Sequence, residues 1–384
     1  MKIYLDNAAT SFPKPSSVVD AVVNYMTNIG SNPGRGSYNN ALEGSRIVYN
    51  CRERICDLFN FHKPENVIFM PNITYSLNVL IKSIVKNNWH IIISSMEHNS
   101  VLRPIFQLKE TMNIDIDVIQ CSEEGFIDLD DFKSKIRQNT KLVVLSHASN
   151  VNGSIQPLYE IGEICRNKGV YFIIDSAQTA GSLEVDFNDL NCNALAFTGH
   201  KSLLGPQGIG GFLIDDELNN LSIPYIVGGT GSLSSQITQP DFLPDKFESG
   251  TLNTPGIAGL LEGIKFIEKE GLKAIRDHED SLTKYFIDSL LNMKDIIFYG
   301  STNVELRTST ISINFNHRDS AEVSYLLDSQ YGVMTRTGLH CAPLAHKTIG
   351  SYPIGTLRFS IGYFNTKEEI KYTIDSLHNI LRGI

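Results

Sequence analysis

The chain has 384 residues, of which 42% are hydrophobic and 20% are charged. This is the composition of a folded globular protein, and the length is enough for one large core or for two domains. The 33 basic and 42 acidic residues give a net charge of −9, with no run of like charges and no basic stripe interleaved with aromatic residues. We therefore expect no nucleic-acid partner.

The amino terminus shows no signal peptide, because its residues lack both a long apolar core and a small-residue cleavage site. No apolar stretch reaches the length of a membrane span, so we expect a cytoplasmic protein without a membrane partner. The six cysteines are scattered without a CxxC pair, which favours reduced thiols. Cys51 and Cys165 fall on the apolar stripes of two predicted helices, where core packing is their expected role.

Short apolar runs alternate with longer amphipathic runs through the first two thirds of the chain. This alternation is typical of βα units built on a mostly parallel sheet. The predicted strands, in chain order, are NVIFM (66–70), HIIISS (90–95), IDIDVIQ (114–120), KLVVLSH (141–147), VYFIID (170–175), ALAFTGH (194–200) and GIGGFLI (208–214). Helices are predicted between most of them, which gives a large α/β domain.

The pattern changes after the segment GTLNTPGI at 250–257. A long helix rich in Glu and Lys is followed by the strand TSTISINF (308–315), the helix SAEVSYLLDSQ (320–330), the strand TLRFSIG (356–362) and a closing helix from Thr366. This order predicts a second, smaller α+β domain. The Gly-, Ser- and Pro-rich stretch 228–245 is interpreted as an ordered loop near the domain junction.

Polar residues follow several of the predicted strands. Ligands of open parallel sheets bind beyond the carboxyl ends of the strands, so these residues are candidates for one site. They are Glu97, His98, His147, Asn150, Asp175, Gln178, Thr198, His200 and Lys201. Acids, amides, imidazoles and one lysine are thus expected at a single edge of the sheet.

Lys201 directly follows a buried strand, where a solvated lysine is out of place, and this suggests a Schiff base. A lysine that caps a loop is the simpler alternative. Two features favour the Schiff base: Asp175 could hold the nitrogen of a pyridoxal phosphate ring, and Thr74 opens a helix whose start could bind phosphate. Asp175 could instead be a helix cap. The glycines of GPQGIGG lead into a strand, so they do not match a dinucleotide-binding fingerprint.

Nine segments, which span nearly the whole chain, together resemble one family. They are YLDNAATSFPKP, NPGRGSY, MEHNSV, SHASNVNGSIQPL, IIDSAQTAGS, FTGHKSLLGPQGIG, FESGTLNTPGI, RTGLHCA and LRFSIGYFNT. The family is that of the class V, fold-type I pyridoxal phosphate enzymes, and within it the cysteine desulfurases and selenocysteine lyases of the SUF type. The resemblance implies a large cofactor-binding domain at 15–255, and a small α+β domain at 1–14 and 256–384 that carries a catalytic cysteine loop.

The resemblance also implies residue roles. Lys201 would bind the cofactor as a Schiff base, with Asp175 on the pyridine nitrogen, Gln178 on the ring hydroxyl and His98 stacked on the ring. Thr74, Thr198 and His200 would bind the phosphate, together with Thr251 of the partner subunit in a homodimer. Asn150, also counted among the cofactor-binding residues, and Arg358 would hold the substrate carboxylate. Two departures stand out: Ile73 replaces a usual threonine, and the segment 228–250 is short.

Cys341, in the stretch TGLHCAPLAH (337–346), has three possible roles. This stretch has too many turn formers for a helix to be expected. A metal site would use Cys341 with His340 and His346, but no fourth ligand is near, so we expect no metal. Packing is the usual role of a free cysteine. A loop beside Arg336 favours a reactive thiol instead, and the family has its sulfur-accepting cysteine at this point.

The implied activity is a pyridoxal phosphate-dependent conversion of L-cysteine to L-alanine, with transfer of sulfur to Cys341 as a persulfide and onward to an acceptor protein, as in iron–sulfur cluster assembly. Several alternatives stay open. The chain could be a selenocysteine lyase, a cysteine sulfinate desulfinase or another class V aminotransferase, the last of which has no use for Cys341. A catalytically silent partner in sulfur trafficking is a further alternative from a different class.

Overall fold

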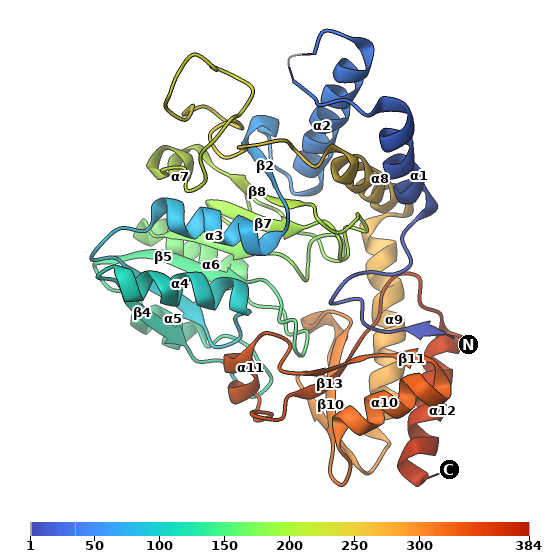
Figure 1. Ribbon diagram of the computed structural model, residues 1–384. Helices are drawn as coiled ribbons and strands as arrows, with labels where there is room; N and C mark the ends of the chain where they lie inside the picture. Colours follow the sequence, from blue (N-terminus) through green and yellow to red (C-terminus); the bar gives the residue numbers. More distant parts are fainter. Residues whose placement is uncertain (1, 35, 384) are drawn as a thin grey trace.

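The computed structural model describes residues 2–34 and 36–383. Arg35, in the segment NPGRGSY, and the two terminal residues of the predicted small domain lie outside this range. Across the described residues, the helices are all too short or too polar to cross a bilayer. Figure 1 shows a large central sheet with helices on both faces, a smaller sheet beside it, and the long helix α9 (Leu272–Leu291) running past both.

The large sheet has seven strands in the order β2-β8-β7-β6-β5-β3-β4. Its strands are β2 (Val67–Met70), β3 (His90–Ser94), β4 (Asp115–Ile119), β5 (Thr140–Ser146), β6 (Tyr171–Asp175), β7 (Ala194–Thr198) and β8 (Gly210–Ile214). The five strands from β7 to β4 pair in parallel, whereas β8 is antiparallel to both β7 and β2. The α/β fold and the mostly parallel sheet are thereby confirmed, and every predicted strand is present.

Alternating side chains of the central strands pack against helices on opposite faces, as the two-residue period of a strand requires. Leu145, Ile174 and Leu195 belong to the core on one face, and Val144 and Ile173 belong to the core on the other. The first core is covered by α2 (Asn39–Leu58), α5 (Leu129–Lys135), α6 (Leu158–Lys168) and α8 (Thr254–Glu270); the second is covered by α3 (Ile73–Ile84), α4 (Asn99–Thr111) and α7 (Asp216–Leu221). Cys51 and Cys165 are fully buried in the first core, as predicted.

The smaller sheet has the strand order β12-β13-β10-β9 and is antiparallel. Its strands are β9 (Ile296–Tyr299), β10 (Thr310–Phe315), β12 (Arg336–Gly338) and β13 (Thr356–Ser360). Helices α9, α10 (Ser320–Tyr331) and α12 (Lys367–Arg382) share its core. Helix α12 begins where predicted, because Thr366 and Glu369 form a reciprocal capping box.

The amino-terminal segment packs against the carboxyl-terminal third of the chain. Strand β1 (Ile3–Tyr4) pairs in parallel with β11 (Val333–Met334). The Ser360 N–H donates to the carbonyl of Leu5 at 2.7 Å. Residues 5–11, which we call the strap, then run between the two sheets toward the end of β7, while helix α1 (Ser16–Asn24) follows on the other side.

Helix α8 begins at the predicted boundary near residue 255, and its apolar face, with Ile257 and Ile264, is part of the core of the large sheet. One local feature differs from the sequence-based expectations. The stretch after Cys341 contains the short helix α11 (Pro343–Thr348), although a helix was not expected there. Pro343 was counted as a turn former, but at the first position of a helix its fixed φ and missing N–H are well tolerated.

Candidate active site

The carboxyl ends of β3, β5, β6 and β7 meet at one edge of the large sheet. Ser146 at the end of β5 is in register with Asp175 at the end of β6, and Asp175 is in register with Ala196 of β7. The residues that follow these strands therefore converge, as the sequence predicted. They include His98, Asn150 and Lys201.

Lys201 and Asp175 are the charged pair at the centre of this edge. Burial lowers the pKa of the Lys201 amine to about 8, against the opposing effect of Asp175. Burial also raises the pKa of the Asp175 carboxyl, although it accepts hydrogen bonds from the Ala177 N–H at 2.9 Å and the Ser100 hydroxyl at 3.3 Å. The buried Asp175 carboxyl has no salt bridge among the described residues. Because a buried charge needs a partner of opposite charge, Asp175 is suited to bind a cationic group.

His98 caps the start of α4 and lies beside this pair. Its Nδ1 accepts the Ser100 N–H at 3.0 Å, so the proton of the neutral ring is carried by Nε2. Burial and the neighbouring Lys201 lower the pKa of His98 to about 4, which keeps the ring neutral. Ser100 thus links His98 to Asp175, because its N–H donates to His98 Nδ1 and its hydroxyl donates to Asp175. Sequence reasoning missed Ser100, because a serine at the start of a helix usually serves only that helix.

Glu97 and His147 lie behind the site and support it. The Glu97 carboxylate accepts from the Ser94 hydroxyl at 2.5 Å and from both the N–H and the hydroxyl of Ser146, so it joins the ends of β3 and β5. Burial raises its pKa to about 7. His147 is almost fully buried, and burial lowers its pKa to about 4. Both residues help to hold the strand ends.

Arg358 extends from β13 of the small sheet into the same space. Its Nη1 donates to the carbonyl of Asn150 at 2.9 Å, and its Nη2 donates to Asp6 at 2.8 Å. Its Nε is buried and has no partner among the described residues. The sequence predicted that this inward guanidinium needs an anion, but it did not identify Asp6. The available signal was an aspartate directly after the apolar residues Ile3, Tyr4 and Leu5.

Cys341 is exposed on a loop held over the edge of the sheet. His340 and Cys341 both have left-handed backbone angles, with φ of 46° and 58°, which non-glycine residues adopt only at an energetic cost. Two hydrogen bonds fix this conformation: the Asn150 side chain donates to the His340 carbonyl at 2.7 Å, and the Asn99 N–H donates to the Cys341 carbonyl at 2.8 Å. The loop thus presents the thiol in a defined place.

The two histidines near Cys341 serve the loop itself. His340 Nε2 lies 3.1 Å from the Thr356 hydroxyl, and His346 Nδ1 lies 2.6 Å from the Ser351 hydroxyl. In the part of the chain that the structure describes, no three His, Cys, Asp or Glu side chains are grouped to hold a metal ion. Burial lowers the pKa of His340 to about 2 and that of His346 to about 4, so both rings are neutral.

The residues expected to bind phosphate lie at the other end of the site. Thr198 ends β7, and Gly210 separates it from the start of α3: a Cβ on Gly210 would lie 3.3 Å from the Thr198 Cα and 3.2 Å from the Asn72 Cα. The Thr198 hydroxyl and the His200 Nδ1 are buried without partners among the described residues. Thr74, in the first turn of α3, is exposed.

Gln178 and Thr251 complete the predicted set. The Gln178 side chain donates to the carbonyl of Ala8 in the strap at 3.2 Å. Thr251 is exposed and lines a groove between α2 and residues 229–252. The structure therefore brings all the predicted residues except Thr251 to one edge of the sheet within a single chain. Thr251 was predicted to bind the phosphate in the active site of the partner subunit. That role concerns a second chain and stays a prediction.

The side chains at this edge fit pyridoxal phosphate. The Thr198 hydroxyl and the His200 nitrogen are unpartnered, and Thr198 lies across Gly210 from the start of α3, where a phosphate gains both hydrogen bonds and a favourable dipole. The uncompensated Asp175 suits a protonated ring nitrogen, and Lys201 has a lowered pKa that suits bond formation with an aldehyde. Arg358 adds a buried guanidinium, a group that pairs well with the carboxylate of an amino acid.

Comparisons with known proteins agree with this arrangement. A probable cysteine desulfurase of Methanothermobacter thermautotrophicus is 31% identical, over 98% of this chain and 94% of the relative. A cysteine desulfurase of Shigella flexneri is 31% identical, over 99% and 93%. The solved structure of a cysteine desulfurase from Thermococcus onnurineus matches with a TM-score of 0.93 and 31% identity, over 100% of this chain and 95% of that one.

The sequence model of the aminotransferase class-V family matches residues 3–373, which is almost the whole chain. Members of this family and the cysteine desulfurases related to it depend on pyridoxal phosphate. The match spans both sheets and every residue of the candidate site. The chain therefore belongs to the aminotransferase class-V family.

Proposed function

We propose that the protein is a pyridoxal phosphate-dependent cysteine desulfurase that converts L-cysteine to L-alanine and takes the sulfur onto Cys341. The observation that carries this proposal is the exposed Cys341 thiol on a strained loop that is tied directly to the site residue Asn150 and to the start of helix α4 at Asn99. An aminotransferase would have no use for a thiol held there. The names of the relatives support the same activity.

The residues of this chain bind and orient the substrate. Arg358 and Asn150 receive the carboxylate, and the guanidinium of Arg358 stays protonated although burial lowers its pKa. Lys201 would hold the cofactor, and its lowered pKa of about 8 leaves part of the amine unprotonated near neutral pH, so that it can take the Cα proton. When bound, pyridoxal phosphate supplies an electron sink for the charge left at Cα, and Asp175 sustains it by holding the ring nitrogen protonated.

The sulfur step needs no external oxidant. The Cys341 sulfur forms a bond to the substrate sulfur while the substrate Cβ–S bond breaks, and the electron pair of that bond stays with Cβ, which takes up a proton. The substrate carbon is thereby reduced to a methyl group, and the two sulfurs share the oxidation as a persulfide. The atoms balance as cysteine plus one protein thiol giving alanine plus one protein persulfide.

The wider setting is proposed in the same way. We expect a homodimer in which Thr251 of one subunit reaches the phosphate site of the other; the exposed groove that contains Thr251 supports this arrangement. A sulfur-acceptor protein would collect the persulfide, and the compartment is the cytoplasm.

Two domains are also proposed. The packing of β1 with β11 supports the inclusion of residues 1–14 in the small domain, and the packing of α8 against the large sheet favours a boundary nearer to residue 271 than to 255.

One experiment tests the activity. The purified holoenzyme is incubated with L-cysteine, L-selenocysteine and L-cysteine sulfinate; alanine is measured, and the peptide that contains Cys341 is examined by mass spectrometry for an added sulfur. We expect alanine from L-cysteine together with persulfide on Cys341. Amino-group transfer to an oxoacid without alanine from L-cysteine would identify an aminotransferase instead. The absence of any turnover despite bound cofactor would favour the silent partner.

A further inference from the structure

Asp6 of the strap binds two guanidiniums at once. Its carboxylate accepts from Arg358 Nη2 at 2.8 Å, from Arg336 Nη2 at 2.8 Å, and from Arg336 Nε at 3.1 and 3.0 Å. The side chains of Asp6 and Arg358 are 12% and 3% exposed, whereas that of Arg336 is 50% exposed. One carboxylate thus lies between an inner and an outer arginine.

The two arginines would repel each other without it. Arg336 and Arg358 are direct cross-strand partners in the antiparallel pair β12–β13, and like charges in this position destabilise a sheet. With Asp6 the group of three carries a net charge of +1. The count follows from two guanidiniums and one carboxylate, and it matches the single carboxylate of an amino acid.

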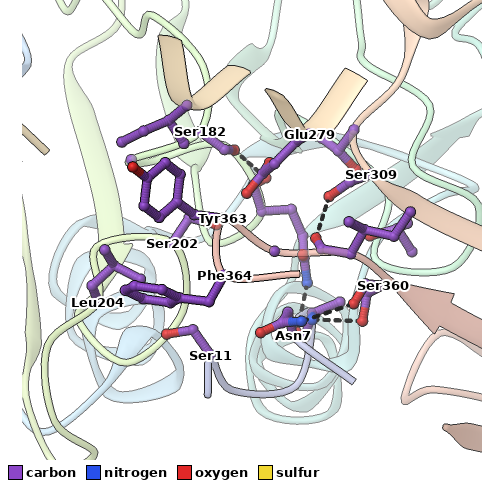
Figure 2. Close-up of a pocket in the computed structure, with 18 residues that line it drawn as sticks. Asn7, Ser11, Ser182, Ser202, Leu204, Glu279, Ser309, Ser360, Tyr363 and Phe364 are labelled. Atoms are coloured by element: carbon purple, nitrogen blue, oxygen red, sulfur yellow. Dashed lines mark hydrogen bonds between the residues drawn. The ribbon is translucent and has the colours of Figure 1, made fainter. Parts of the chain in front are cut away.

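Asp6 also fixes the orientation of the Arg358 guanidinium. Nη2 is occupied by Asp6 and Nη1 by the Asn150 carbonyl, so Nε is the nitrogen without a partner among the described residues. Hydrogen bonds to Ser360 fix the strap that carries Asp6: the Ala8 N–H donates to the Ser360 hydroxyl at 2.8 Å, and the Asn7 side chain donates to the Ser360 carbonyl at 3.0 Å. Figure 2 shows Asn7 and Ser360 joined in this way. The orientation of Arg358 is therefore built in before any substrate arrives.

We propose that Asp6 is a positioning residue of the proposed reaction: it neutralises Arg336 and holds the guanidinium of Arg358 in place, so that a substrate carboxylate binds Arg358 alone and in the productive place. Only the expected changes in KM and kcat rest on the proposed function, because acetate binding can be measured without turnover. Without the negative charge of Asp6, two facing guanidiniums would share the substrate carboxylate. Binding would become tighter and less productive.

The test uses a charge series on the holoenzyme. Asp6→Asn raises the net charge of the group to +2, and Asp6→Asn with Arg336→Gln returns it to +1. Acetate, a bare carboxylate, is titrated by calorimetry, which requires no turnover. We expect acetate to bind about tenfold more tightly to Asp6→Asn than to the parent, and the double variant to return to parental affinity. Asp20→Asn, an exposed aspartate of α1, is the control and leaves acetate binding unchanged.

The kinetic part separates positioning from general support of the fold. For L-cysteine, Asp6→Asn is expected to lower KM and to lower kcat by about tenfold, since tighter but misplaced binding costs turnover. A merely structural role would raise KM and would not be reversed by Arg336→Gln. Unchanged acetate affinity in Asp6→Asn, or a double variant no closer to the parent, would overturn the proposal. If the parent itself releases no alanine, the acetate titrations still decide the role of Asp6, and only the proposed function fails.

Discussion

The Asn99 N–H, at the first turn of α4, donates to the carbonyl of Cys341 at 2.8 Å. The residue before Asn99 is His98, which caps the same helix and is linked through Ser100 to Asp175. The thiol loop of the small sheet and the ring-facing residues of the large sheet are thus positioned by one helix start. A displacement of α4 would move both together.

Replacing Cys341 with alanine is expected to abolish desulfuration and to spare cofactor binding. The variant should produce at least about 100-fold less alanine from L-cysteine, because a thiol leaves poorly without a nucleophile to take its sulfur. Selenocysteine and cysteine sulfinate carry better leaving groups and should retain more activity. Cys121→Ala, which removes the one other cysteine that is only partly buried, serves as the control and should keep the parental rate. Parental alanine production by Cys341→Ala would reduce Cys341 to a packing role.

Lys201→Ala is expected to eliminate covalent attachment of the cofactor. The matched control is Lys14→Ala, because burial lowers the pKa of Lys14 to about 8 as well, and its amine lies 2.8 Å from the carbonyl of His200. After borohydride reduction, mass spectrometry should find the cofactor fixed to the parent and to Lys14→Ala, and absent from Lys201→Ala. Fixation in Lys201→Ala would show that the lysine has been misassigned.

Arg358→Ala should weaken substrate binding far more than cofactor binding. The loss of a buried, charge-assisted partner costs a carboxylate about 2 to 5 kcal/mol, and this loss appears as a higher KM for L-cysteine. Steady-state kinetics and a cofactor titration measure the two effects separately. An unchanged KM and kcat would remove Arg358 from the substrate site.

Glu279 should make the stability of the protein depend on pH. Its side chain, from α9, lies in the small cavity between the two sheets that also contains Asn7 and Ser360 (Figure 2). Burial raises its pKa from 4.5 to about 8, so the folded state keeps a proton that the unfolded state has lost. The stability that Glu279 contributes, measured as the free energy of unfolding, is therefore fully present below pH 4.5. It is lost as the pH rises through about 8.

Glu279→Gln removes the titrating group and should flatten that decline. Denaturant unfolding at several pH values measures the effect, which for the parent is on the order of 4 kcal/mol across the interval. Glu53→Gln, an exposed residue of α2, should leave the parental pH dependence intact. A Glu279→Gln profile as steep as that of the parent would contradict the assignment.

Much of the fold and of the site could be predicted because the signals are local. Strand runs such as HIIISS and VYFIID, each followed by polar residues, indicate both a parallel sheet and the edge where His98, Asp175 and Lys201 meet. The inward arginine of TLRFSIG could also be found in this way, because a charged residue within an apolar strand requires a partner.

The remaining features depend on contacts between distant parts of the chain. Nothing near Asp6 indicates that it would lie between Arg336 and Arg358, since both arginines come from the far end of the sequence. The antiparallel edge formed by β2 and β8 has no local signal either, because a buried strand has the same apolar run in both directions. The placement of α8 likewise depends on which sheet its apolar face meets.

The pairing of Asp6 with Arg358 joins residues 352 positions apart. During synthesis the strap leaves the ribosome among the first residues, and it has no partner until β13 has been made. A chain that stops short of β13 can already contain Lys201 and Asp175, yet it has neither the arginine that receives the substrate nor the surface on which the strap closes. Since domains fold as they emerge, completion of this contact is a late event. A chain that ends before β13 is therefore expected to bind cysteine weakly, because it has no arginine to receive the substrate carboxylate.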